Sequence, residues 1–580
     1  MKMTKRAFFI LVIILIFSSC FSDWKGDKAT LTISFGGSNG RAAAWPPTES
    51  GILGEIEYTV TLSSGSTKLE PIKKNGTETI TVEIDPGLWK VEIEARIGDL
   101  PFAAGSNSKD VIAGQNNHVD VPMKEKNEFT FFAVDSSTEW ENVMKLISGY
   151  EDPPTGKHCV IIVTKDFPAN NLTPSASNIT ICGNHTITLT GTGSLLNVYT
   201  SRNVTLRDVK LKGMGIESDN TAPLVLVEGG SFTMKGSASI TGNNNNGGNG
   251  GGVIVYNGKF TMMDNAVISG NTATGKLVDE SSSSWLGGNG GGVYVNNGEF
   301  TMLGNASVSN NKYVSPSGGG FSKGGGVCVN GGIFIMNGGT ISGNKFEVGG
   351  NYSGGGVYIE GGGTFTMTGG TIGGDNAADA NKAAHGSGVF VFDGTFTMDD
   401  GEVSGNIVGD GVYIYENINN IFNMNGGKIS GNIKTDDVGG GGVSFNGGTF
   451  NMTGGTISGN KTNGNGGGVY VDGGTFTMTG GTISGNTVSG NGDDSGWGGG
   501  VYVESGTFRI VTGTVYGSEN TIDASLRNNA TTNGAALYKV PNGVAQYGTD
   551  SNWTSFSDST IDAYSENATI EVVDGEKKSP

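Results

Sequence analysis

The sequence predicts an all-β protein in which a small β-sandwich precedes a parallel β-helix, a tube of stacked coils. Three observations support this prediction: strand-like alternation in the N-terminal part, one short helical pattern after it, and a glycine-punctuated repeat beyond both. Glycine accounts for 102 of the 580 residues without a collagen-like Gly-X-Y period. A repeat whose copies are each too small to bury their own apolar face is typical of a solenoid.

The first twenty residues have the pattern of an export signal. Basic residues precede an apolar run over 8–17 that is too short to span a bilayer. Ser18-Ser19-Cys20 follows, with Phe17 where leucine is usual, and resembles the lipobox of bacterial lipoproteins. The resemblance implies that Cys20 is lipidated and that the protein is anchored in the outer membrane or at the cell surface. An ordinary secretory peptide is the alternative.

A polar tether over 21–28 leads to a segment, 29–124, in which apolar and polar residues alternate. Side chains two positions apart in a strand share a face, so runs such as 56–62 and 89–97 each offer one buried and one solvated face. We therefore expect a small antiparallel β-sandwich. The run 86–91 resembles one strand of the immunoglobulin-like or transthyretin-like modules of bacterial surface proteins.

One helix is predicted at about 137–148, where apolar residues recur at helical spacing. Ser136 with Glu139 fits a capping box, and Thr138 with Glu141 is an alternative. A bare end of a β-tube exposes unpaired strand edges and invites aggregation, so we expect this helix to cap the tube. A plain linker helix is the other interpretation.

The repeat holds three short apolar runs separated by glycines. In one copy, Val469 and Val471 share a face, Phe476 and Met478 share the next, and Ile483 follows alone. Three strands per coil predict a triangular tube whose coils stack about 4.8 Å apart, with like residues in columns. The copies lie 26 to 40 residues apart, with phenylalanine at Phe232, Phe260, Phe300, Phe334, Phe365, Phe396, Phe422, Phe450, Phe476 and Phe508. We expect the β-helix over 128–573, its strict repeats at about 231–515, and a C-terminal coil and cap at about 516–573.

An asparagine lies three residues beyond the Ile or Val of most copies. An amide both donates and accepts hydrogen bonds, so stacked asparagines are expected to form a structural ladder along the tube. In two copies Asp375 and Ser518 take the equivalent position. The predicted ladder residues are Asn243, Asn271, Asn311, Asn344, Asn406, Asn432, Asn460 and Asn486.

These repeats resemble right-handed parallel β-helix proteins of the pectate-lyase-like superfamily. The Gly-Gly-Val and Ser-Gly-Asn elements, as in 467–469 and 484–486, are similar to repeats of bacterial polymorphic outer-membrane proteins and related adhesins. The resemblance covers roughly 130–573. It implies a right-handed tube and either adhesion or the cleavage of polysaccharides.

Length variation indicates where a ligand would bind. The stretch between the ladder asparagine and the next Val ranges from five residues after Asn406 to 21 after Asn271. Insertions thus collect at one corner of the tube, which in solenoids often binds partners. Two of these loops carry a tryptophan, Trp285 and Trp497, each of which either contacts a ligand or folds back onto the tube.

A second candidate is the outward position of the first strand, which is aromatic in many copies. Stacked coils would align these rings, which could offer flat faces to sugars. Cross-strand stacking that only stabilises the sheet is the alternative. The candidate ligand-binding residues in this column are Tyr294, Tyr358, Tyr413, Tyr470 and Tyr502.

An enzyme of this fold would need paired carboxylates on one face of the tube. The acidic pairs 399–400, 436–437 and 493–494 lie at different points of the repeat, so the sequence assigns no catalytic residue, metal ligand or cofactor. The net charge of −19 argues against nucleic acid as a partner. The sequence therefore favours a lipid-anchored adhesin or binding protein for a host or bacterial surface glycan or protein. The alternative is a polysaccharide lyase or glycoside hydrolase.

Overall fold

The computed structural model falls into two compact units, Met1–Ala133 and Val134–Pro580. It describes residues 28–35, 56–75, 79–98, 100–125, 129–148, 158–215, 220–279, 284–286, 288–314, 323–347, 354–490, 495–519, 523–549, 552–556 and 564–578. The predicted export signal, Cys20 and most of the tether lie outside the described residues. Each unit is considered by itself below.

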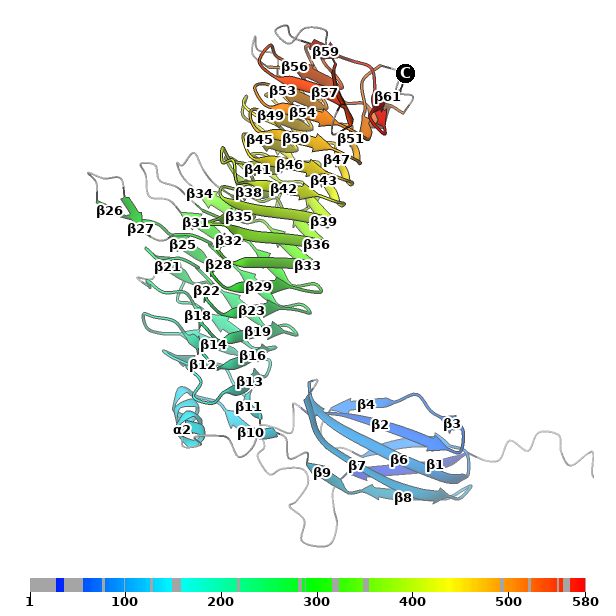
Figure 1. Ribbon diagram of the computed structural model, residues 1–580. Helices are drawn as coiled ribbons and strands as arrows, with labels where there is room; N and C mark the ends of the chain where they lie inside the picture. The colour runs from blue at the N-terminus through cyan, green and yellow to red at the C-terminus, as the bar shows by residue number, and fades with distance from the viewer. Residues whose placement is uncertain are drawn as a thin grey trace, which may run out of the picture. The chain divides into compact units, whose positions relative to one another are not determined.

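The first unit contains two small β-sheets (Figure 1). One has the order β5-β1-β8, and the other has the order β3-β2-β6-β7-β9, with β4 paired to β2. Both bury one face, as the alternation predicts: Val91 and Ile93 of β6 are buried, whereas Glu92 between them is exposed. The strands are β1 (Ala29–Phe35), β2 (Ile56–Ser64), β3 (Thr67–Lys68), β4 (Ile72–Asn75), β5 (Ile80–Ile84), β6 (Gly87–Ile97), β7 (Leu100–Val111), β8 (Asn116–Val121) and β9 (Met123–Glu125).

The expectation of a purely antiparallel sandwich is wrong at one strand. β1 pairs antiparallel with β5 but parallel with β8, with Ile33 opposite Val119. Alternation determines which side chains face the core, whereas either strand direction places the same side chains on the same face. The direction of β8 therefore could not be read from the sequence.

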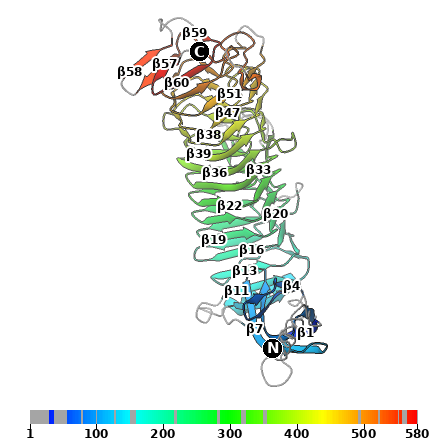
Figure 2. The same cartoon turned by 90° about the vertical axis from the view of Figure 1, so that its right-hand side faces the viewer.

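The second unit is a parallel β-helix (Figures 1 and 2). Its coils stack in register, so that their strands form three sheets. Among the described residues, the phenylalanine sheet has 28 strands, the valine sheet has 13 and the corner sheet has nine. Like residues pair along each sheet: Phe396 pairs with Phe422, and Phe422 with Phe450. Neighbouring phenylalanine rings stack with centroids 4.9 and 4.6 Å apart at these two steps.

The phenylalanine sheet consists of β10 (Phe129–Val134), β11 (His158–Val163), β12 (Phe167–Ala169), β13 (Asn178–Cys182), β14 (Thr186–Leu189), β16 (Asn203–Arg207), β17 (Lys210–Lys212), β19 (Ser231–Lys235), β20 (Ser239–Thr241), β23 (Lys259–Met262), β24 (Val267–Ser269), β29 (Glu299–Met302), β30 (Ser307–Ser309), β33 (Ile333–Ser342), β36 (Gly363–Gly373), β39 (Gly394–Ser404), β42 (Ile421–Met424), β43 (Lys428–Ser430), β46 (Thr449–Met452), β47 (Thr456–Ser458), β50 (Thr475–Met478), β51 (Thr482–Ser484), β54 (Thr507–Ile510), β55 (Gly513–Val515), β57 (Val544–Thr549), β58 (Asn552–Ser555), β60 (Ile570–Val573) and β61 (Glu576–Lys577).

The valine sheet consists of β15 (Leu196–Tyr199), β18 (Val225–Glu228), β22 (Val253–Tyr256), β28 (Val293–Asn296), β32 (Val327–Asn330), β35 (Val357–Glu360), β38 (Val389–Val391), β41 (Val412–Ile414), β45 (Val443–Phe445), β49 (Val469–Val471), β53 (Val501–Val503), β56 (Leu537–Lys539) and β59 (Tyr564–Glu566). The corner sheet consists of β21 (Asn244–Asn246), β25 (Thr272–Thr274), β31 (Lys312–Val314), β34 (Lys345–Glu347), β37 (Lys382–Ala383), β40 (Ile407–Val408), β44 (Ile433–Lys434), β48 (Lys461–Thr462) and β52 (Thr487–Val488).

The three walls differ from the three predicted runs. The phenylalanine and isoleucine runs belong to one sheet, and β33, β36 and β39 each extend over both without a break. The third wall is the corner sheet, formed by residues directly after the ladder asparagine. Its strands are only two or three residues long, so no periodicity in the sequence marks them.

The asparagine ladder is present, and it is longer than predicted. In most steps one asparagine donates its backbone N–H and its side-chain amide to the side-chain oxygen of the next; between Asn432 and Asn460 the distances are 3.0 and 2.9 Å. All eight predicted members are fully buried. Asn220 adds a rung before Asn243.

Two predicted rungs were wrong. Asn381 takes the place assigned to Asp375, because the loop 374–380 carries the chain out of the coil before the rung. Asn528, rather than Ser518, accepts from Asn486 for the same reason. Spacing along the sequence therefore misses a rung wherever a loop precedes it.

Both ends of the tube are covered. The predicted helix is present as α2 (Ser137–Ser148), and Glu139 donates its backbone N–H to Ser136 Oγ at 3.3 Å, which is one half of the predicted capping box. The Glu139 side chain accepts from the backbone N–H of Asp135 at 2.9 Å rather than from that of Ser136. α2 lies at the N-terminal end of the tube, where Trp140 is buried (Figure 1). At the other end β60, β59 and β58 pair antiparallel with β55, β56 and β57, and a short 3-10 helix, η2 (Ala524–Leu526), precedes them. These reversed strands cover the edge of the last coil.

Candidate functional site

The predicted variable stretches join strands of the corner sheet to strands of the valine sheet, as between β25 and β28. One of them folds into a hairpin of its own, in which β26 (Lys276–Asp279) pairs antiparallel with β27 (Ser284–Leu286) (Figure 1). Trp285 lies on β27, with Leu277 opposite it. The predicted variable corner therefore carries a small element that the other coils lack in their described parts.

The second predicted tryptophan folds back onto the tube. Trp497 is half-buried, and its ring stacks on Tyr538 with centroids 5.4 Å apart. Tyr538 is in turn stacked on Tyr502 at 5.8 Å. This geometry favours the interpretation that Trp497 packs against the tube over the interpretation that it contacts a ligand.

The aromatic column of the valine sheet points away from the valine core, yet its rings are buried. Tyr294, Tyr358, Tyr413, Tyr470 and Tyr502 are between 0% and 9% exposed. Rings of adjacent coils cover one another, as between Tyr470 and Tyr502, whose centroids are 5.4 Å apart. This burial favours stabilisation of the sheet over presentation of flat faces to a sugar.

A second aromatic row, which sequence reasoning missed, lies beside the first. Phe392 and Tyr415 follow their valine-sheet strands by one residue and stack with centroids 4.9 Å apart. Both are half-buried and pack against the buried column. The turn after Tyr415 carries Ile418, which is 89% exposed. The sequence signal for this second row is an aromatic residue two positions after an aromatic residue of the first column.

The candidate acidic pairs do not converge. Asp399 and Asp400 are exposed, and Asp399 Oδ1 accepts a hydrogen bond from Asn425 Nδ2 at 2.8 Å. Asp436 and Asp437 are exposed at the variable corner, and 493–494 lie outside the described residues. Within the described ranges, no group of three or more His, Cys, Asp or Glu side chains is arranged to hold a metal ion.

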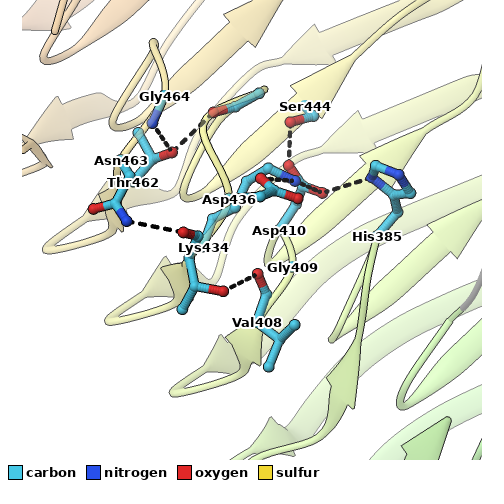
Figure 3. Close-up of polar contacts among 12 residues, drawn as sticks. His385, Val408, Gly409, Asp410, Lys434, Asp436, Ser444, Thr462, Asn463 and Gly464 are labelled. Atoms are coloured by element: carbon cyan, nitrogen blue, oxygen red, sulfur yellow. Dashed lines mark hydrogen bonds and ion pairs between the residues drawn. The ribbon is translucent and has the colours of Figure 1, made fainter. Parts of the chain in front are cut away.

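The repeat itself is broken most strongly around Asp410, and the departures meet in space (Figure 3). Asp410 stands two residues before Val412, where most copies carry glycine, and Ser444 interrupts the aromatic column between Tyr413 and Tyr470. Lys434 occupies a column of the corner sheet that holds Thr462 in the next coil. We call Asp410, Lys434, Ser444, His385 and Asp436 the buried polar cluster.

Asp410 lies at the centre of this cluster. Its Oδ2 is 3.1 Å from Lys434 Nζ and 3.8 Å from His385 Nδ1, and its Oδ1 accepts a hydrogen bond from Ser444 Oγ. The side chains of Asp410 and Lys434 are 0% and 1% exposed. Lys434 Nζ also lies 3.2 Å from Oδ1 of the half-exposed Asp436. Two buried charges thus face each other with little access to water.

The backbone next to Asp410 is strained. Val408 has a φ of 88°, an unfavourable angle for a β-branched residue, and is 40% exposed although its column is otherwise mostly buried. Val408 pairs with Lys434 of the next coil. The turned-out valine leaves the buried space to the lysine side chain. Strain of this kind persists only where the surrounding structure imposes it.

The groups around Asp410 favour its ionised form. Burial raises the pKa of Asp410, but Lys434, His385 and Ser444 outweigh burial and hold the pKa below its usual value. The arrangement differs from a serine-hydrolase triad, because Ser444 Oγ donates to the carboxylate rather than to the histidine. His385 instead stacks on Tyr413, with ring centroids 4.8 Å apart.

A second buried ion pair lies three coils earlier. Glu360, 6% exposed, has its Oε2 2.5 Å from Lys323 Nζ and its Oε1 4.0 Å from Cys328 Sγ. Burial raises the pKa of Glu360 despite the nearby lysine. Unlike the cluster around Asp410, this pair has no second carboxylate within ion-pair distance among the described residues.

The first unit carries a shallow hollow of about 630 Å³ on the outer face of its larger sheet. It is lined by Thr59, Thr61, Glu92, Glu94, Ser106 and Lys124, among others.

No helix in the described part of the chain is long and apolar enough to cross a membrane.

Neither protein-family models nor curated proteins nor solved structures gave a match to this chain when compared with it.

Proposed function

We propose that this protein is a cell-surface adhesin or binding protein, anchored in the outer membrane or at the cell surface by a lipid on Cys20. In this proposal the tube is a right-handed, pectate-lyase-like β-helix, and the first unit is an immunoglobulin-like or transthyretin-like spacer. The tube presents its variable corner to a glycan or protein on a host or bacterial surface. The proposal requires no catalytic residue and no cofactor.

One observation supports this proposal above the others: the coils are uniform in their core and variable at one corner. The interior columns of valine, phenylalanine, methionine, isoleucine and asparagine are fully buried, as at Phe422 and Met424. Several connections between the corner sheet and the valine sheet differ in length from coil to coil, and the one between β25 and β28 contains the β26–β27 hairpin. A rigid scaffold with variable loops at one edge is a common arrangement for binding proteins.

Binding can be tested by replacing the hairpin, residues 276–287, with a short glycine–serine link. The purified variant and the unaltered protein are applied to a glycan array and to whole cells. We expect binding to fall by about tenfold or more, equivalent to about 1.4 kcal/mol. The matched control is Ile418→Ser on another corner, which should bind normally. Equal binding by the hairpin variant would contradict the assignment of this corner.

Anchoring is tested separately with Cys20→Ser. Cells that express the unaltered protein are fed radiolabelled palmitate, and we expect label in the protein and its recovery with membranes. The Cys20→Ser variant should carry no label. Labelling of the variant would show that Cys20 is not the lipidation site.

The alternative, a polysaccharide lyase or glycoside hydrolase, predicts a different readout. Polysaccharides that the array identifies as ligands are incubated with the protein and assayed for new reducing ends and unsaturated uronides. Binding without release of product supports the adhesin. Release of product that persists through purification would replace our proposal with an enzymatic function.

A further inference from the structure

The buried polar cluster holds an amine and a carboxyl group close together in a site with little access to water. Lysine is almost never fully buried in proteins unless it is paired, and an ion pair removed from water has a large desolvation cost. Here Lys434 comes from β44, and Asp410 follows β40 in the preceding coil. The two side chains are 1% and 0% exposed and lie 3.1 Å apart at Nζ and Oδ2.

We propose that Lys434 and Asp410 condense to an intramolecular amide that links two successive coils of the tube. The proposal concerns a modification of the chain and is independent of the ligand that the tube binds. The link would join residues of adjacent coils across the corner at which the chain is strained at Val408.

The reaction is balanced without any external reactant. The Lys434 ammonium loses one proton to Asp410 Oδ2, which yields a neutral amine and a neutral acid. The nitrogen lone pair then forms a bond to Asp410 Cγ. The bond from Cγ to Oδ2 breaks with its electron pair on oxygen, and this oxygen takes a second proton from the nitrogen and leaves as water. The product is one secondary amide and one water molecule, and the net charge of the pair is zero before and after.

Two remaining members of the cluster, Asp436 and Ser444, are each placed for one part of this reaction. Asp436 Oδ1, 3.2 Å from Lys434 Nζ, can accept the ammonium proton and pass it on. His385 Nδ1 lies 3.8 Å from Oδ2, the oxygen that leaves, and makes no hydrogen bond there. Ser444 Oγ donates to Oδ1, the oxygen that becomes the amide carbonyl, and so stabilises the negative charge that develops on it.

Proximity and burial supply the driving force. Groups held in reactive geometry behave as if present at an effective concentration on the order of 10⁵ M or more. Conversion to an amide also removes two charges from a poorly solvated site. A Cβ on Gly439 would lie 2.7 Å from Ser444 Oγ and 3.2 Å from Lys434 Cε, which shows how closely the backbone covers the pair. The backbone at Gly439 therefore leaves little room for water on that side of the pair.

Glu360 and Lys323 provide an internal comparison. Their charged atoms are closer, at 2.5 Å, but the Lys323 side chain is 25% exposed, and no carboxylate other than Glu360 is near its amine among the described residues. Solvent access and the missing proton acceptor should leave this pair ionic. Of these two pairs, only the one at Asp410 combines burial of both partners with groups that can move the protons.

The experiment is mass spectrometry of the denatured full-length protein and of its proteolytic peptides. We expect a mass lower by one water than that calculated for the same processed polypeptide, and a branched peptide that joins Asp410 to Lys434. A cyclic imide at Asp410-Gly411 would also lose one water, but it would stay within a single peptide and would hydrolyse in mild alkali. Such an imide, or an unaltered mass after prolonged incubation of the folded protein, would overturn the proposal.

Matched variants sharpen the test. Lys434→Arg keeps a cation but cannot form the amide, so its mass should equal that calculated for its processed polypeptide and the branched peptide should be absent. Lys461→Arg, at an exposed position of the next coil, should retain the link in full. A water loss that persists in Lys434→Arg would contradict the assignment. The branched peptide of the unaltered protein is decisive even if Lys434→Arg fails to fold.

Discussion

Asn344 Oδ1 accepts two hydrogen bonds from Asn311 of the preceding coil, from the backbone N–H at 3.0 Å and from Nδ2 at 3.1 Å. Asn344 Nδ2 in turn donates to the carbonyl oxygen of Val308 at 2.9 Å. Both asparagines are fully buried. One amide side chain therefore satisfies polar groups of its neighbour that water does not reach.

Asn344→Ala should destabilise the coils on either side of it. The substitution removes the acceptor of the buried Asn311 N–H and the side-chain donor to the Val308 carbonyl, at about 1–3 kcal/mol for each group left unsatisfied, whereas Asn311 Nδ2 keeps its bond to the Ile268 carbonyl. We expect a loss of about 3 kcal/mol, measured by hydrogen exchange of the amides around residues 308–345, since solenoids can open locally. Asn425→Ala, an exposed asparagine, should change stability by no more than about 0.5 kcal/mol. Equal effects of the two substitutions would contradict a structural role for the ladder.

Phe422→Ala should be among the most damaging substitutions in the tube. The ring is fully buried and lies between Phe396 and Phe450, and it is inclined by only 1° to the ring of Phe396. Loss of a buried phenylalanine costs about 3–5 kcal/mol, because a cavity replaces its contacts. The adjacent Ile421, 37% exposed, faces outward where Thr395 and Thr449 stand in neighbouring coils. Ile421→Thr should therefore leave the thermal midpoint nearly unchanged, and a large drop would indicate that this outer face is covered.

The effect of replacing a glycine of the repeat on the thermal midpoint should depend on how close the atoms of the neighbouring coil lie. A Cβ on Gly468 would meet the carbonyl oxygen of Gly500 in the next coil at 2.6 Å, so Gly468→Ala must push two coils apart. Gly362 has open space and a φ of +74°, which asparagine tolerates. We expect Gly468→Ala to lower the thermal midpoint clearly and Gly362→Asn to be nearly neutral. The reverse order would contradict the stacking of these coils.

Glu360→Gln should alter the pH dependence of stability. Burial raises the pKa of Glu360 in the folded protein, so folding is favoured by protonation of this carboxyl group. Its contribution is complete below the ordinary pKa of glutamate, about 4.3, and is lost as the pH rises through the raised pKa. The thermal midpoint of the unaltered protein should therefore fall relative to that of Glu360→Gln as the pH is increased above this value. Parallel pH profiles of the two proteins would contradict the raised pKa.

Much of the tube could be predicted because each column repeats a local pattern. Val469, Phe476 and Ile483 alternate with residues that suit the opposite face, and every copy repeats the same alternation. The burial of Tyr470 could not be predicted in this way, because alternation places it on the outer face and says nothing about what covers that face. Its cover comes from neighbouring coils and from the loop that precedes its strand.

The candidate site depended even more on tertiary structure. Asp410 and Lys434 are separated along the chain and carry no motif, and only the stacking of their coils brings Nζ within 3.1 Å of Oδ2. Ser444 stands in the sequence where many copies have an aromatic residue, but nothing in the sequence indicates that its partner is Asp410. His385 likewise gave no sign of the carboxylate that it faces.

By itself, the sequence determined the repeating coil, the residues that fill its interior, the capping helix and the corner at which insertions collect. These follow from periodicity and turn chemistry, which act between residues close together in the chain. The tertiary structure alone decided the direction of β8, the third wall of the tube, the rungs at Asn381 and Asn528, and the meeting of Lys434 with Asp410. Each of these depends on which coil lies next to which, and loops of unequal length set that alignment.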